Sequence, residues 1–239
     1  MMSLPLNLIP KHGERVVVVG RSGSGKTQLS KWMLWHMPGA IIYDTKTEDA
    51  FEEMGPIVES TDEAFEIFAE EGSDVDFVVV RPPPWMIAHP MALDHMLLDH
   101  YERGHGITAY IDEAYQFHKN GRPGPGYVSL QTRGRSKNIT TITSSQRPAW
   151  LSTFAFSEMN HLFALRLQLD DDRKRLGDVI NGYDKRSKPP EYHFDYADAS
   201  GEAITRFGPI DIDYRPAALY REIERGGELP ARSQYFNWI

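Results

Sequence analysis

The chain has 239 residues, of which 41% are hydrophobic and 25% are charged, as expected for a globular protein with a full core. Its formal net charge of −8 argues against a protein that coats nucleic acid with its whole surface. The sequence contains no cysteine, which excludes disulfides and cysteine-bound metal and fits a reducing cytoplasm. Segment 1–10 lacks the features of a signal peptide, and no apolar run approaches the ~20 residues of a membrane helix, so we expect no transmembrane segment.

The hydrophobic pattern predicts strands that alternate with helices along most of the chain. The expected strands are 15–20, 40–43, 76–80, 107–111, 139–144 and 161–169. The expected helices are 26–37, 61–70, 90–103, 128–136 and 170–180. This alternation predicts an α/β fold with a doubly wound, mostly parallel sheet and helices on both faces. Towards the end of the chain, the pattern predicts a small hairpin (192–197 and 203–207) and a short helix near 216–225.

A phosphate-binding loop follows the first predicted strand. Residues 20–27 (GRSGSGKT) match GxxxxGK[ST] without mismatch, between a strand and a helix. The glycines let the backbone curl so that its N–H groups bind phosphate oxygens, and the helix that begins there adds its positive end. Lys26 is expected to bind the β- and γ-phosphates, and the hydroxyl of Thr27 to bind Mg²⁺. The predicted nucleotide site therefore comprises Gly20, Arg21, Ser22, Gly23, Ser24, Gly25, Lys26 and Thr27.

Two adjacent carboxylates, Asp112 and Glu113, end the predicted strand 107–111. Ligands of a doubly wound sheet gather at the carboxyl ends of its strands. We therefore expect Asp112 to hold the magnesium shell opposite Thr27, and Glu113 to act as general base towards the attacking water. The strand from 139 ends in TSSQRP, where Gln146 is expected to contact the γ-phosphate or the water. The polar end of strand 40–43, Asp44 and Thr45, either borders this site or lies apart from it.

A stretch rich in basic residues follows the acidic pair. No acidic residue lies between Glu113 and Glu158, and the basic residues there are Lys119, Arg122, Arg133, Arg135, Lys137 and Arg147. Such a stretch is either a solvated loop or a local patch for nucleic acid. Four histidines between 89 and 105 do not share one helical face, so we expect no metal site there.

Segment 134–148 (GRSKNITTITSSQRP) resembles the stretch after the acidic pair in the FtsK–HerA superfamily of DNA-pumping ATPases. That family has an arginine, a strand and a Gln-Arg-Pro-like turn at this place. The resemblance continues through strand 161–167 (HLFALRL) into an Asp-rich helix start that carries Arg173. It covers residues 15–180 and is greatest for the small viral members of the superfamily, the genome-packaging ATPases.

The resemblance implies a RecA-like (ASCE) P-loop ATPase that uses ATP and Mg²⁺. It implies a homo-oligomer, usually a hexameric ring, with ATP at the subunit interfaces and double-stranded DNA in the pore. Lys26, Glu113 and Gln146 match the catalytic positions. An arginine of a neighbouring subunit stabilises the transferred phosphate in such sites; the first candidate is Arg135, followed by Arg173 and Arg133.

The resemblance also indicates how an acidic chain handles DNA. Basic loops from several subunits converge on one axis and concentrate the field there. The Gly/Pro-rich loop 119–126, with Lys119 and Arg122, is the candidate pore loop. We divide the chain into a P-loop ATPase core, 1–190, and a C-terminal extension, 191–239, packed on the core or on a neighbouring subunit.

The expected function is an ATP-driven motor that packages DNA into a viral capsid. Capsid or virion proteins are then further partners, and the place of action is the host cytoplasm, or the virion or procapsid. The alternatives are a phage assembly ATPase that drives extrusion, although such proteins usually carry a membrane helix, and a nucleotide-dependent scaffold that does not move DNA. A GTPase lacks support because no Asn-Lys-x-Asp guanine motif is present, and a small-molecule kinase would not need the Asp-Glu pair.

Overall fold

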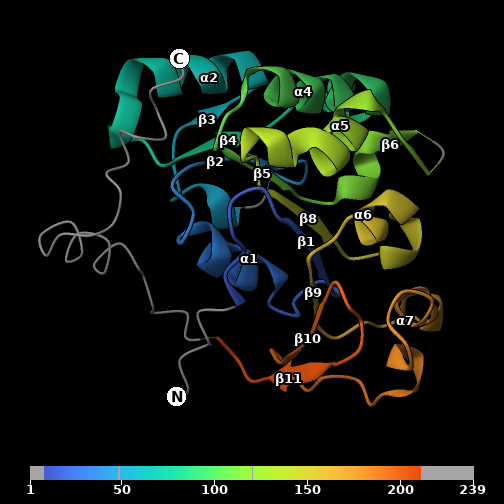
Figure 1. Ribbon diagram of the computed structural model, residues 1–239. Helices are drawn as coiled ribbons and strands as arrows, with labels where there is room; N and C mark the ends of the chain where they lie inside the picture. Colours follow the sequence, from blue (N-terminus) through green and yellow to red (C-terminus); the bar gives the residue numbers. More distant parts are fainter. Residues whose placement is uncertain (1–7, 48, 120, 211–239) are drawn as a thin grey trace, which may run out of the picture.

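A nine-stranded sheet forms the centre of the computed structural model, which describes residues 8–47, 49–119 and 121–210 (Figure 1). The strands from β9 to β3 are parallel, β10 is antiparallel to β9, and β11 is antiparallel to β10. In their spatial order the strands are β11 (Thr205–Phe207), β10 (Phe194–Asp198), β9 (His161–Ala164), β1 (Arg15–Val19), β8 (Thr141–Ser145), β5 (Thr108–Ile111), β2 (Ala40–Tyr43), β4 (Phe77–Val80) and β3 (Ile57–Val58).

The register of the central strands brings three loops to one edge of the sheet. Strand β8 lies between β1 and β5, with Val19 opposite Ser145 and Ile111 opposite Thr143. Because the three strands are parallel, their carboxyl ends meet at the same edge. Strand β1 (RVVVV) is buried along its whole length, as β-branched strands covered on both faces are. The loops after β1, β5 and β8 are therefore neighbours on a rigid support.

Helices cover both faces of the sheet (Figure 1), which confirms the predicted doubly wound α/β fold. Helices α2, α4 and α5 pack on one face through residues such as Phe65, Leu97 and Tyr127. Helix α1 covers the other face, where Leu29 and Met33 meet the sheet. The helices are α1 (Lys26–Leu34), α2 (Thr61–Glu71), α3 (Pro84–Ile87), α4 (Pro90–Arg103), α5 (Pro125–Arg133), α6 (Thr153–Ser157) and α7 (Asp170–Gly177).

Helix α5 begins earlier than the sequence pattern predicted, at Pro125 instead of 128. The carboxylate of Asp94, on α4, accepts hydrogen bonds from the backbone N–H groups of Gly126 and Tyr127, each at 2.8 Å. A Cβ at Gly126 would lie 2.1 Å from the carbonyl oxygen of Asp94, so only glycine permits this close approach of the two helices. The side chain that caps α5 thus comes from another helix, and no motif in the sequence around α5 predicts it.

The segments that flank the sheet core also differ from the prediction. The predicted strand 161–169 ends at Ala164. The predicted loop 119–126 contains a small separate hairpin of β6 (His118–Lys119) and β7 (Arg122–Pro123) before α5 begins. The predicted C-terminal hairpin is present and continues the main sheet, since β10 pairs with β9. The helix predicted near 216–225 lies outside the described residues. Within the described part of the chain, no helix combines the length and apolar character needed to cross a bilayer.

Candidate active site

The loop between β1 and α1 has the backbone that its glycines predict. Gly23 and Gly25 lie in the left-handed region, with φ of 71° and 99°, where residues with a Cβ are strained. Glycine is required at position 20 for a different reason, the close approach of neighbouring side chains. A Cβ there would lie 2.8 Å from the Cβ of Leu165 and 2.6 Å from the Oγ of Ser24, so any larger residue would push the loop away from β9.

Backbone hydrogen bonds hold this loop against the two neighbouring strands. The N–H of Gly20 donates to the carbonyl of Ser145 at 3.2 Å, and the N–H of Arg21 to that of Arg166 at 2.9 Å. The N–H groups in the first turn of α1 have no acceptor within the helix. The buried hydroxyl of Ser24 has no hydrogen-bond partner within the described residues. The N–H groups at a helix N-terminus fit a phosphate group, and the buried Lys26 begins this helix.

The two carboxylates after β5 are nearly inaccessible to water. Asp112 is 4% exposed and Glu113 is 1% exposed. The Nζ of Lys46 lies 2.5 Å from Oε1 of Glu113 and 3.9 Å from Oδ2 of Asp112. The backbone N–H of Gln146 donates to the other oxygen of Glu113, at 3.1 Å. One ammonium therefore offsets part of the negative charge of the pair, and one amide N–H binds Glu113, as buried carboxylates require such partners.

Lys46 was not identified as a site residue from the sequence. It follows β2, whose carboxyl end lies beside that of β5, with Tyr43 opposite Ile111. The one available signal was a cation just after a strand that neighbours the acidic pair. The buried carboxylate of Asp44 accepts from the backbone N–H of Lys46 at 3.1 Å and from the Nε of Arg81 at 3.0 Å. The end of β2 therefore borders the site and fixes the loop that carries Lys46.

The oxygen ligands that Mg²⁺ prefers are present at this edge. Asp112 offers a buried carboxylate and Thr27, at the start of α1, a half-buried hydroxyl. Burial raises the pKa of Tyr110 well above its usual range. This phenol stays protonated and donates to Oδ1 of Asp112 at 3.4 Å. The donor set fits a magnesium–triphosphate complex.

The Gln-Arg-Pro turn after β8 is anchored to α7. The Nε of Arg147 donates to both carboxylate oxygens of Asp172, at 3.0 and 3.3 Å, and its guanidinium lies 4.3 Å from the ring centre of Trp150. Asp172 also accepts from the N–H of Ala149 at 3.1 Å. These contacts fix the backbone at Gln146, whose N–H reaches Glu113. The half-buried Gln146 thus stands between the phosphate-binding loop and the acidic pair.

The three arginines considered for the transferred phosphate occupy different places in the fold. The exposed Arg135 packs beside Gly13, before β1, and so lies at the edge of the sheet opposite that loop. Arg173 is buried and donates to the carbonyls of Asp184 and Arg186, at 2.9 and 2.5 Å. Arg133 donates to Ser129 Oγ at 2.5 Å. Only in a neighbouring subunit would Arg135 meet a nucleotide.

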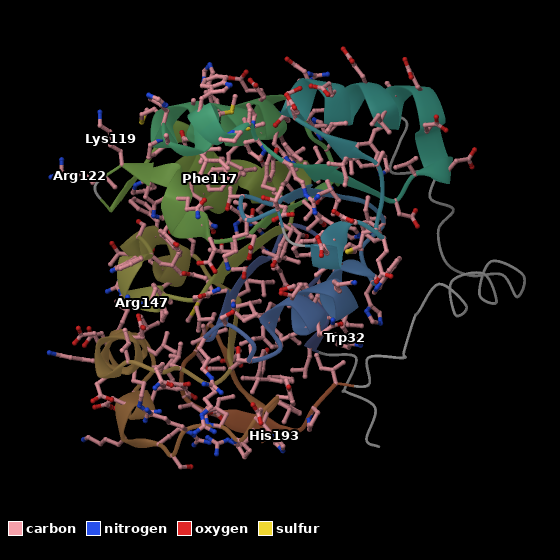
Figure 2. All side chains as sticks on the ribbon, turned by 180° about the vertical axis from the view of Figure 1, so that it is seen from behind. Trp32, Phe117, Lys119, Arg122, Arg147 and His193 are labelled. Carbon is pink, nitrogen blue, oxygen red and sulfur yellow. The ribbon has the colours of Figure 1, made fainter. Side chains whose placement is uncertain are left out.

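The hairpin of β6 and β7 presents basic side chains to solvent. Lys119 and Arg122 are exposed and project from one side of the molecule, whereas Phe117 lies inside it (Figure 2). Phe117 and Tyr127, which flank the hairpin in sequence, are fully buried core residues. Lys119 and Arg122 are therefore the basic side chains that the described part of the hairpin offers to a partner.

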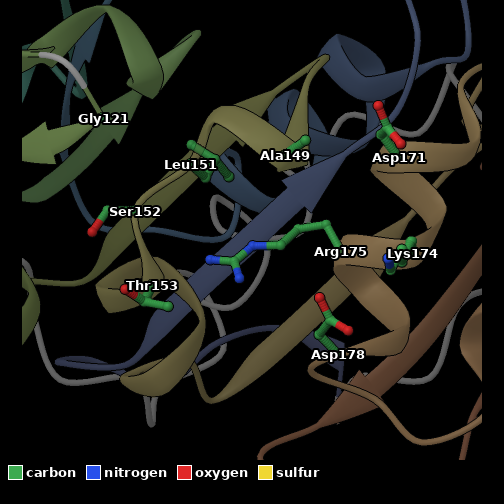
Figure 3. A pocket seen from close by; sticks show the side chains of 9 residues that line it. All are labelled: Gly121, Ala149, Leu151, Ser152, Thr153, Asp171, Lys174, Arg175 and Asp178. Carbon is green, nitrogen blue, oxygen red and sulfur yellow. The ribbon is translucent and has the colours of Figure 1, made fainter.

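An open hollow of about 410 Å³ separates this hairpin from α7. Figure 3 shows the side chain of Arg175 extending from α7 towards the segment that carries Ser152 and Thr153. The other lining residues are Gly121, Ala149, Leu151, Asp171, Lys174 and Asp178. Its walls join the hairpin to the segment that follows the Gln-Arg-Pro turn.

Comparison with known proteins relates this chain to viral DNA packaging. No family model matches the chain. The chain is 30% identical over 177 residues to the DNA packaging ATPase P9 of Enterobacteria phage PRD1. The matched region covers 70% of this chain and 69% of P9.

Solved structures agree on the fold. The genome packaging NTPase B204 of Sulfolobus turreted icosahedral virus 2, in complex with ATP-gammaS, superposes with a TM-score of 0.67 at 21% identity, over 83% of this chain and 98% of that chain. VirB4 of Thermoanaerobacter pseudethanolicus matches with a TM-score of 0.59 at 11% identity, over 82% and 89% of the two chains. The sequence similarity to P9 shows that this chain belongs to the family of phage DNA-packaging ATPases.

Proposed function

We propose that this chain is a genome-packaging motor that hydrolyses ATP and uses the energy to move double-stranded DNA into a viral capsid. The observation that carries the proposal is the meeting of three elements at one edge of the sheet. These are a phosphate-binding loop at the N-terminus of α1, a buried pair of carboxylates, and an amide-bearing turn bonded to Glu113. We infer the DNA substrate and the capsid from membership in the packaging-ATPase family.

In the proposed reaction, the N–H groups of the loop and the ammonium of Lys26 bind the β- and γ-phosphates. Thr27 and Asp112 would hold Mg²⁺, which would withdraw charge from the phosphate oxygens. Glu113 takes a proton from the attacking water. The water oxygen bonds to the γ-phosphorus as the bond between that phosphorus and the β–γ bridging oxygen breaks. ADP and phosphate leave. Gln146 contacts the γ-phosphate or the water from the end of β8.

Lys46 has a defined part in this cycle. Its ammonium, 2.5 Å from Oε1 of Glu113, supplies positive charge to two buried carboxylates before Mg²⁺ arrives. A like-charge pair in a water-poor site would otherwise repel. Lys46 thereby keeps the site assembled between turnovers.

A homo-oligomeric ring, hexameric in our proposal, completes the site and makes the pore. Arg135 of one subunit reaches the γ-phosphate bound by the next, where it stabilises developing charge. The Lys119 and Arg122 hairpins of all subunits converge on one axis, so a chain with a net charge of −8 still presents a basic channel to DNA. We assign residues 1–190 to the ATPase core and 191–239 to an extension. The motor acts in the host cytoplasm, at a procapsid or virion whose proteins it contacts.

Steady-state ATP hydrolysis, measured with and without long double-stranded DNA, tests the proposal. We expect DNA to stimulate hydrolysis by the wild type. The nearly isosteric Glu113→Gln variant should lose about 100-fold or more of the rate, since a general base contributes on that scale, while it still binds nucleotide. A wild-type rate that is the same with and without DNA would contradict the motor and favour an assembly ATPase. Nucleotide binding without hydrolysis would favour a scaffold.

A further inference from the structure

A second cavity adjoins the phosphate-binding loop and opens beside the start of α1. It has a volume of about 370 Å³, within the range of small-molecule sites. One wall is formed by Gly25, Gln28 and Leu29, at the end of the loop and the first turn of α1. The opposite wall comes from Leu165, after β9, and from Tyr192 and Phe194, at the start of β10. The C-terminal hairpin therefore completes a pocket that is continuous with the phosphate-binding loop.

The tyrosine at the mouth of this pocket has an unusual backbone conformation. Tyr192 has a φ of 60°, in a turn closed by a hydrogen bond from the N–H of His193 to the carbonyl of Pro190 at 3.2 Å. Glycine or asparagine is favoured at such a turn position. A bulky residue held there costs free energy, and such strained positions concentrate at ligand sites. The side chain is 54% exposed, so burial of the ring does not explain why tyrosine occupies the turn.

Two contacts tie this turn to the phosphate-binding loop. The Cδ1 of Tyr192 lies 3.4 Å from the position that a Cβ on Gly25 would take, so the ring rests on the glycine before Lys26. The guanidinium of Arg21, within the loop, lies 3.7 Å from the carboxylate of Glu191. Both residues of that pair are partly exposed, so the pair orients the turn more than it stabilises the fold. These contacts hold the ring beside Gly25, at the start of α1.

We propose that this pocket binds the nucleobase and ribose of the nucleotide, with the base stacked on the ring of Tyr192. The inference rests on the proposed function, because a triphosphate in the loop fixes where its nucleoside can lie. Leu29, Leu165 and Phe194 form apolar walls, which suit the flat face of a base, and bases stack on aromatic side chains in this way.

The pocket recognises a purine by shape more than by hydrogen bonds. Among the described residues that line it, only Gln28 and Tyr192 carry a polar side chain. The carboxamide of Gln28 offers both donors and an acceptor, so it satisfies the edge of adenine and of guanine alike. Strong selection between the two needs buried groups that one base leaves unpaired. We therefore expect ATP and GTP to bind within about 10-fold of each other.

Calorimetric binding of the non-hydrolysable analogue AMPPCP and of inorganic tripolyphosphate, both with Mg²⁺, separates the base from the phosphates. Tyr192→Ala should weaken AMPPCP binding about 10-fold, the scale of one stacking contact, and leave tripolyphosphate binding unchanged. Tyr192→Phe keeps the ring and should match the wild type. Trp85→Ala is the matched control, since Trp85 is 62% exposed and lies on α3, outside the pocket.

Three outcomes overturn the inference in different ways. AMPPCP binding that Tyr192→Ala leaves intact would remove the stacking role while the phosphate site stands. Equal loss of AMPPCP and tripolyphosphate in Tyr192→Ala would show that the ring supports the loop and does not touch a base. A wild type that binds neither ligand would refute the proposed function itself, and the pocket assignment with it.

Discussion

The ion pair between Lys46 and Glu113 gives a quantitative test of how the site is held together. Removing one partner of a buried pair leaves the other charge without compensation, at a cost of about 3–5 kcal/mol. The side chain of Lys46 is 22% exposed, so water recovers part of that loss and we expect about 2 kcal/mol for Lys46→Met. Glu113→Gln, in which the amide oxygen still accepts from the N–H of Gln146, should cost less, about 1 kcal/mol.

Because both substitutions remove the same interaction, their effects should not add. Urea unfolding of the wild type, the two single variants and the double variant, without nucleotide or metal, gives the coupling energy. We expect a coupling of about 1–2 kcal/mol. Arg103 and Asp62 form an exposed ion pair, 42% and 70% accessible, and the same cycle on that pair should give nearly zero. Effects of Lys46→Met and Glu113→Gln that add within about 0.5 kcal/mol would refute the role of Lys46.

Three further predictions follow from other parts of the structure. Lys119→Ala with Arg122→Ala should make the negative slope of log DNA affinity against log salt shallower by about 2; an unchanged slope contradicts a DNA-binding hairpin. Mixing inactive Arg135→Ala with inactive Glu113→Gln should restore part of the ATPase rate, whereas an arginine acting within its own chain restores none. Burial lowers the pKa of His100 to about 4, so between pH 6.5 and 4 protonation of the unfolded chain should remove ~3 kcal/mol of stability, measured by urea unfolding against His100→Asn.

The sequence predicted those parts of the fold and site whose causes are local. Helix α4 (Pro90–Arg103) begins at a proline and ends before a glycine, and its bounds agree with the prediction. Strand β2 also agrees. The phosphate-binding loop could be predicted because its spacing of glycines, lysine and threonine has one physical use. Buried apolar strands placed the acidic pair at the correct edge of the sheet.

Features that depend on distant residues could not be predicted in this way. Lys46 meets Glu113 only because β2 and β5 are neighbours in the sheet. Asp94 sets the start of α5 from another helix. The C-terminal hairpin was expected as a unit, but its pairing with β9, which brings Tyr192 beside Gly25, follows from the sheet order alone. The sequence around Lys46, Asp94 or Tyr192 does not indicate which distant residue each of them contacts.

Movement along DNA is the central claim, and displacement of a triplex-forming oligonucleotide from a linear duplex measures it most directly. A motor that tracks along double-stranded DNA strips the third strand from its path without separating the duplex. We predict displacement with ATP and Mg²⁺, none with AMPPCP, and none by Glu113→Gln. ATP hydrolysis by the wild type that proceeds in the presence of this DNA, while the third strand stays bound, would contradict the account.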